Sequence, residues 1–154
     1  ISAVTKRFYP KWDEAAYQKY LSLFDLDPQK QVKALSSGMK VKYMLALALS
    51  HHAQLLILDE PTSGLDPVSR DDLLALFRKL VESGERSILF STHITTDLEK
   101  CADDITYIKD GKLVAWAEKS AFIHSFQHLL APGEEGPLSL EEIMTRSERN
   151  AYAL

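Results

Sequence analysis

The 154-residue chain is poor in cysteine and has no long apolar run. Its one cysteine, Cys101, excludes an internal disulfide framework and is typical of a reducing compartment. Its longest apolar run, from Met44 to Leu49, is far shorter than the ~20 residues that a membrane-spanning helix needs. The formal net charge of −4 argues against a basic platform for nucleic acid.

Glycine is also scarce, and its distribution has a chemical consequence. The chain has 6 glycines, and none of them precedes Gly38. The motif G-x-x-x-x-G-K-[ST], which cradles nucleotide phosphates through backbone amides and a lysine, is absent from the 154 residues. These residues therefore cannot provide a phosphate loop of that kind.

What the chain does have is an apolar run that ends in two acids. Residues Leu55–Leu58 precede Asp59 and Glu60 and predict a strand that is buried on both faces. Ligands of open α/β sheets bind at the carboxyl edge of such strands, and two buried carboxylates are costly there unless a metal, a base role or a proton compensates them. We therefore predict a Mg²⁺-nucleotide site, with Asp59 on the metal side and Glu60 beside the attacking water. From this segment alone, the alternative of two acids that begin a solvated loop stays open.

A second candidate segment is a serine-glycine turn. The run Leu35, Ser36, Ser37 and Gly38 is expected to open a helix that continues to about Ser50. Backbone amides and the helix dipole make such an N-terminus suitable for an anion. A plain serine N-cap is the alternative interpretation.

Two further segments are expected to lie near strand ends. Ser63 and Gly64 turn the chain toward a helix that Asp66 caps and that has Pro67 at its first position. Residues 87–92 are expected to form a strand with His93 at its end. A lone histidine is more often structural than catalytic, and only its place at a carboxyl strand end singles it out.

The rest of the chain carries local signals of structure. An Asp-Gly turn between residues 105–108 and 112–117 predicts a hairpin. Two Ser/Thr-x-x-Glu patterns predict capping boxes at helix starts, namely Thr96 with Glu99 and Ser139 with Glu142.

The four motifs, in this order, resemble those of the ATP-binding subunit of ABC transporters. The family has a signature close to LSGGQ, then an apolar run with D-E-P, then S-G-L-D, then a strand that ends in T-H. This chain has LSSGM at 35–39, LLILDEP at 55–61, SGLD at 63–66 and STH at 91–93. The resemblance covers roughly residues 11–117, and a chance match of all four motifs in order is very improbable.

The resemblance implies an α/β fold, namely a partial P-loop NTPase core of the ABC ATPase type with a parallel sheet and a helical subdomain. It implies that the N-terminal strands, the Walker A loop and the Q-loop are missing, so we expect the carboxy-terminal part of a nucleotide-binding domain. The expected divisions are a helical signature subdomain at 1–50, the carboxy-terminal part of the ATPase core at 51–130, and a linker with a short helix at 131–154.

The resemblance also implies roles for particular residues. Glu60 and His93 would be catalytic, as general base and as the histidine that contacts the γ-phosphate, while Asp59 would help to hold Mg²⁺ through water. The opposite subunit's ATP would be contacted by Ser36, Ser37 and Gly38. The two sites of a dimer would communicate through Ser63, Gly64 and Asp66. Ser37 stands where the family has glycine, and Met39 replaces a glutamine whose hydrogen bond methionine cannot donate.

The implied function is ATP hydrolysis, with ATP and Mg²⁺ as cofactors. The implied partners are a second ABC ATPase subunit and a transmembrane permease, with no nucleic acid. The protein would be cytoplasmic, held at the inner face of the cell membrane by the permease. The loop style resembles the type-2 exporter subclass, which exports antibiotics, peptides or polysaccharides.

Two other interpretations stay open. A soluble ABC-type ATPase of translation or DNA repair is the alternative for the whole protein. For the 154 residues alone, we expect little or no ATPase activity, because the phosphate loop and its lysine are missing.

Overall fold

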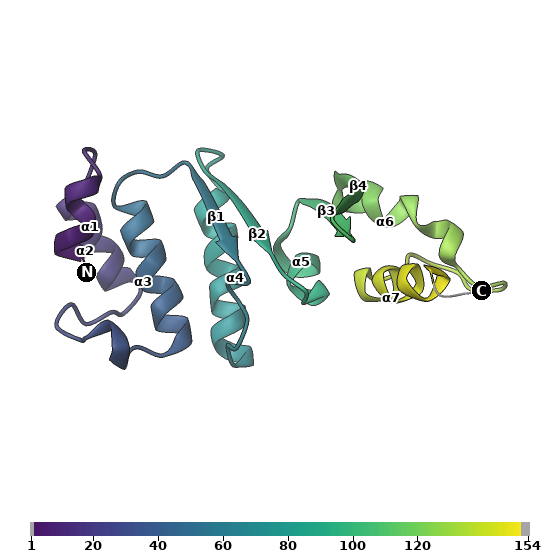
Figure 1. Ribbon diagram of the computed structural model, residues 1–154, viewed down its shortest axis with the longest axis horizontal. Coiled ribbons are helices and arrows are strands. Elements are labelled where there is room, and N and C mark those ends of the chain that lie inside the picture. The colour runs from purple at the N-terminus through teal and green to yellow at the C-terminus, as the bar shows by residue number, and fades with distance from the viewer. Residues whose placement is uncertain (1, 152–154) are drawn as a thin grey trace. The chain divides into compact units, whose positions relative to one another are not determined.

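The computed structural model describes residues 2–151 and the side-chain surroundings of residues 4–149. The chain forms two compact units, residues 1–92 and 93–154, and each is described by itself. The first unit contains helices and a parallel strand pair, and the second contains an antiparallel hairpin and helices (Figure 1). The predicted α/β class with a parallel sheet is confirmed. The predicted divisions at residues 50 and 130 stay predictions.

The first unit begins with a helical part. It consists of α1 (Ser2–Thr5), η1 (Lys6–Phe8), α2 (Glu14–Leu23), η2 (Val32–Ala34) and α3 (Ser37–Leu49). Asp13 caps α2, and its carboxylate accepts a hydrogen bond from the Ala16 amide at 2.9 Å. Helix α2 packs against α3 (Figure 1), and both contribute buried apolar residues to the core of this unit, among them Tyr17, Leu21, Leu45 and Leu49.

A strand–helix–strand segment completes the first unit. Strands β1 (Leu55–Asp59) and β2 (Ser87–Ser91) pair in parallel, and α4 (Pro67–Val81) connects them. Helix α4 packs against one face of the pair (Figure 1), and the ring centroids of Phe77 and Phe90 lie 5.8 Å apart. The buried stripe of α4 consists of Leu73, Leu74, Phe77 and Leu80.

The prediction that β1 is buried on both faces is wrong. Leu56 is only 3% exposed, but Ile57 is 71% exposed and Leu55 is 54% exposed. Alternate residues of a strand point to opposite faces, and α4 covers one face alone. Among the described residues, Leu55, Ile57 and the 57% exposed Leu89 thus form an exposed apolar face.

The second unit is built around a hairpin. Its elements are α5 (Thr95–Cys101), β3 (Asp104–Lys109), β4 (Lys112–Glu118), α6 (Lys119–Ser125), η3 (Gln127–Leu129) and α7 (Leu140–Ala151). The predicted Asp-Gly turn is confirmed: Asp110 and Gly111 have φ angles of 49° and 71°, as a tight turn between twisted strands requires.

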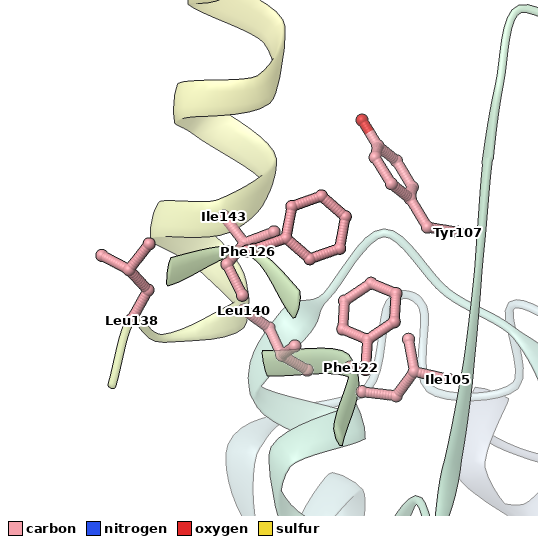
Figure 2. Packing of buried hydrophobic residues seen from close by; sticks show 7 residues of the cluster. All are labelled: Ile105, Tyr107, Phe122, Phe126, Leu138, Leu140 and Ile143. Atoms are coloured by element: carbon pink, nitrogen blue, oxygen red, sulfur yellow. The ribbon is translucent and has the colours of Figure 1, made fainter. Parts of the chain in front are cut away.

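A compact apolar cluster holds the second unit together. Figure 2 shows side chains from the hairpin, α6 and the segment that enters α7 converging on one core, namely Ile105, Tyr107, Phe122, Phe126, Leu138, Leu140 and Ile143. The rings of Phe122 and Phe126 lie 5.0 Å apart. Strand β3 and helices α6 and α7 contribute residues to this cluster, and the partly buried Ala115 and Ala117 of β4 pack against it, so it is the main apolar contact among these elements.

One predicted capping box forms and the other does not. Ser139 and Glu142 exchange side-chain-to-amide hydrogen bonds of 2.8 and 3.2 Å at the start of α7. At α5, by contrast, the N-cap is Ile94, which makes no capping hydrogen bond through its side chain. The prediction for Thr96 and Glu99 is therefore wrong. The Glu99 carboxylate instead accepts a hydrogen bond of 2.9 Å from the amide of Leu140, the first residue of α7.

No helix within residues 2–151 has both the length and the apolar character of a membrane span.

Candidate functional site

The site begins at the carboxyl edge of the parallel strand pair. Asp59 is the last residue of β1, and the register places it beside Ser91, the last residue of β2. The Ser91 hydroxyl donates a hydrogen bond of 2.5 Å to Asp59 Oδ1. It also accepts a hydrogen bond of 3.1 Å from the Glu60 amide. One serine thus joins the two carboxylate-bearing residues that the sequence singles out.

Glu60 has an unusual backbone conformation. Its φ angle is +45°, a region that costs a non-glycine residue about 1–3 kcal/mol and persists only where the surrounding structure holds it. The Glu60 amide also donates to the Ser91 carbonyl at 3.2 Å, and the Glu60 carbonyl accepts from the Ser63 amide at 3.1 Å. These bonds fix the sharp turn by which the chain leaves β1.

The loop that follows continues to turn into α4. Gly64 has a φ of +71°, the left-handed conformation that glycine adopts without strain. Asp66 then caps α4, and its carboxylate accepts from the amides of Val68 and Ser69 at 3.1 Å each. Hydrogen bonds from Ser69, first from its hydroxyl and then from its amide, lower the pKa of the Asp66 carboxyl. The predicted cap and the predicted Pro67 at the first helical position are confirmed.

The serine-glycine turn opens α3 as expected. Ser36 is the N-cap, and its hydroxyl accepts from the Met39 amide at 3.2 Å. The amides of Ser37 and Gly38 belong to the first turn, whose N–H groups have no carbonyl partner within the helix. Together with the helix dipole, they make this end attractive to an anion.

The structure brings this turn against the start of α4. A Cβ built on Gly38 would lie 3.6 Å from Leu65 Cδ2 and 3.6 Å from Ser69 Cβ. The signature turn at 36–38 and the turn at 63–66 are therefore neighbours in one packed unit. The sequence alone indicates neither this contact nor the place of Ser69 in it.

His93 lies in the second unit, where it lines a hollow of about 380 Å³. The other lining residues come from the start of α5 and from α7, namely Ile94, Thr95, Thr96, Glu141, Met144 and Thr145. That His93 and Glu60 act on one phosphate stays a prediction.

Sequence reasoning did not assign a role to Ser91. A signal was present, because a hydroxyl residue at the end of a strand parallel to β1 is expected at the same sheet edge as Asp59. The register between β1 and β2, which places Ser91 beside Asp59, cannot be predicted from the sequence. The structure supplies that register and with it the contact.

The donor set at this edge suits a hard cation. Asp59 and Glu60 offer carboxylate oxygens, which Mg²⁺ prefers. Within the described part of the chain, no group of three or more His, Cys, Asp or Glu side chains is placed to hold a metal ion. Proteins commonly hold Mg²⁺ through one or two carboxylates together with water and substrate phosphates.

Comparisons with known proteins identify the relatives of this chain. Residues 3–96 match a family model described as "AAA domain, putative AbiEii toxin, Type IV TA system". The chain is 32% identical over 110 residues to the ABC transporter ATP-binding protein YtrB of Bacillus subtilis, covering 71% of this chain and 38% of the relative. It is 33% identical over 117 residues to the ATP-binding protein CntD of a metal-staphylopine import system in Staphylococcus aureus, covering 73% of this chain and 42% of the relative.

A solved structure described as the ATP-binding subunit of an ABC transporter is also similar. It has a TM-score of 0.72 and 27% sequence identity, over 94% of this chain and 59% of that one. The chain thus spans about two fifths of the length of the two curated relatives. The family model, the relatives and the shared fold together show that the chain belongs to the ABC transporter ATP-binding proteins and carries the AAA domain of the matching model.

Proposed function

We propose that these 154 residues supply the acidic strand, the signature turn and the intervening loop of a subunit that hydrolyses ATP to drive an ABC transporter. The observation that carries the proposal is the placement of Asp59 and Glu60 together at the carboxyl edge of a parallel strand pair, joined by the Ser91 hydroxyl. Membership in the family supports ATP as the substrate.

Glu60 is the general base in this proposal. Its carboxylate takes up a proton from the attacking water, or orients that water, a role typically worth about 10²–10⁴ in rate. Asp59 would hold Mg²⁺ through water, and the bound cation would supply charge that neutralises the phosphate oxygens. His93 contacts the γ-phosphate. The phosphate loop, which the 154 residues lack, comes from outside them.

The signature turn acts on a second nucleotide. In a head-to-tail dimer, the amides of the turn that contains Ser36, Ser37 and Gly38 face the γ-phosphate held by the other subunit. The closeness of Gly38 to Leu65 and Ser69, which an added Cβ would touch, supports a link between this turn and the loop at 63–66. Ser63, Gly64 and Asp66 then connect the two ATP sites.

The partner in this proposal is a transmembrane permease, which places the subunit at the inner face of the cell membrane. We assign the subunit to an exporter on the style of its motifs. The direction of transport needs its own test, because one relative is named for an import system. Uptake and efflux by inverted membrane vesicles that contain the permease would decide it.

The test compares ATP hydrolysis by the intact subunit with hydrolysis by its Glu60→Gln variant and by the 154-residue chain. We expect a fall of about 10²-fold or more in the variant and no measurable rate for the chain alone. Glu85→Gln, in the exposed turn before β2, is the matched control and should leave the rate unchanged. An unchanged rate in Glu60→Gln would rule out Glu60 as the base.

A further inference from the structure

Ser91 makes two hydrogen bonds at the site with one hydroxyl. A serine hydroxyl has one proton to donate and lone pairs to accept with. The proton goes to Asp59 Oδ1 at 2.5 Å, and a lone pair accepts the Glu60 amide at 3.1 Å. Both functions are therefore used at once, on the two residues that the proposed reaction requires.

The short bond to Asp59 has the geometry of a charge-assisted hydrogen bond, for which O–H···O⁻ separations of about 2.5–2.7 Å are typical. It engages one carboxylate oxygen and leaves the lone pairs of the second for a water of hydrated Mg²⁺. The bond to Glu60 restrains a backbone that has a φ of +45°. The same hydroxyl thus limits both the rotation of the Asp59 side chain and the direction in which Glu60 leaves the strand.

Packing does not explain a serine at this position. Ser91 is exposed, and it lies on the face of the strand pair that α4 does not cover. Removal of its hydroxyl would leave the buried face of the sheet, with Leu56 and Phe90, unaltered. The contacts of the side chain point to the site and not to the core.

We propose that Ser91 is a positioning residue for ATP hydrolysis, which holds Asp59 and Glu60 in their working orientation through its hydroxyl. This inference rests on the proposed function. Ser91 acts through its neighbours and touches neither phosphate nor metal itself. Partners of this kind, one step removed from a metal, typically change metal affinity or activity by about 10–100-fold when they are removed.

The test uses the intact subunit and three substitutions. Ser91→Ala removes the hydroxyl, and Ser91→Thr keeps it on a residue that strands favour. Ser87→Ala removes an exposed serine from the other end of the same strand and serves as the matched control. We expect Ser91→Ala to lower kcat by about 10-fold or more and to raise the Mg²⁺ concentration for half-maximal rate, while Ser91→Thr and Ser87→Ala stay within about threefold of the parent.

Two readouts do not depend on turnover. One is Mn²⁺ binding in the presence of a non-hydrolysable ATP analogue, which we expect to weaken about 10-fold in Ser91→Ala alone. The other is hydrogen exchange of the peptide that contains Glu60, which should become several-fold faster in Ser91→Ala and be restored in Ser91→Thr.

The outcomes separate the two proposals. If Glu60→Gln leaves ATP hydrolysis unchanged while Ser91→Ala accelerates exchange at Glu60, the proposed function fails and the orienting role of Ser91 stands. If Ser91→Ala matches the parent in rate, Mn²⁺ affinity and exchange, the role of Ser91 is overturned. A Ser91→Thr variant as impaired as Ser91→Ala would overturn it too, because the hydroxyl would then not be the active feature.

Discussion

Gly38 in the signature turn lies close to Ser69 in the first turn of α4. A Cβ added to Gly38 would lie 3.6 Å from the Cβ of Ser69. That separation is an ordinary van der Waals contact, so an alanine fits the folded chain. The same residue supplies one of the amides that face phosphate in the proposed dimer, where alanine would restrict the backbone freedom with which this amide approaches the phosphate. Stability and activity can therefore be separated at one residue.

We predict that Gly38→Ala keeps or slightly raises the stability of the chain while it reduces ATP hydrolysis by the intact subunit. Gly38 is helical, and replacing a glycine in a compatible conformation stabilises by about 0.4–1 kcal/mol. Urea unfolding and steady-state hydrolysis are the two measurements. Gly84→Ala is the control that should destabilise, because Gly84 has a φ of +72°. Full activity in Gly38→Ala would contradict the assignment of the turn to phosphate.

A second prediction concerns the exposed apolar face formed by Leu55, Ile57 and Leu89. Strand pairs with open edges and an exposed apolar face tend to associate. We expect the 154-residue chain to self-associate, and Ile57→Ala to reduce that association with a stability change within about 0.5 kcal/mol. Sedimentation velocity over a range of concentrations measures the association.

The matched substitution at the neighbouring residue is Leu56→Ala. Leu56 is only 3% exposed on the covered face, so its truncation should destabilise by about 2–5 kcal/mol. Equal stability losses in Leu56→Ala and Ile57→Ala would contradict the one-sided cover of β1. A chain that stays monomeric at high concentration would contradict the association itself.

The acid stability of the second unit is predicted to depend on Glu134. Arg146 donates to both of its carboxylate oxygens, at 2.5 and 2.9 Å, and this pairing lowers the pKa of Glu134 from 4.5 to about 2. A lowered carboxyl pKa stabilises the fold fully above the unfolded value and loses that effect as pH falls toward the folded value. The stabilisation should therefore be complete at pH 7 and disappear between about pH 4.5 and pH 2.

The measurement is the thermal midpoint of unfolding at steps of pH, for the parent and for Glu134→Gln. The variant should be less stable at pH 7, and its curve should converge with that of the parent near pH 2. Glu135→Gln changes the neighbouring exposed carboxylate and should follow the parent throughout. Parallel curves for the parent and Glu134→Gln would show that the pair with Arg146 does not contribute.

Much of the fold was predictable because its signals are local. The Asp66 cap, the Ser36 cap, the Asp-Gly turn and the Ser139 capping box each depend on a few neighbouring residues. The failures share one cause, which is dependence on distant partners. The burial of Ile57 depends on a second layer over the sheet, and Glu99 bonds with Leu140, 41 residues further along the chain.

The site follows the same division, because its local motif can be predicted from the sequence and its long-range contacts cannot. Asp59 and Glu60 follow from an apolar run with acids at its end, which is visible in the sequence. The hydrogen bond of Asp59 with Ser91 depends on strand register across 32 residues, which the sequence does not encode locally. The contact of Gly38 with Ser69 depends in the same way on how α3 packs against α4.

The pairing of Asp59 with Ser91 has a consequence for how the sheet is selected. The side-chain period of a strand is two residues, so a slip of one residue between β1 and β2 would place Phe90 or Leu58 where the hydroxyl or the carboxylate now stands. The slip would also turn the buried residues of one strand toward solvent. A subunit with misaligned strands would then be inactive as well as poorly packed, so selection for turnover would at the same time maintain the alignment of the sheet.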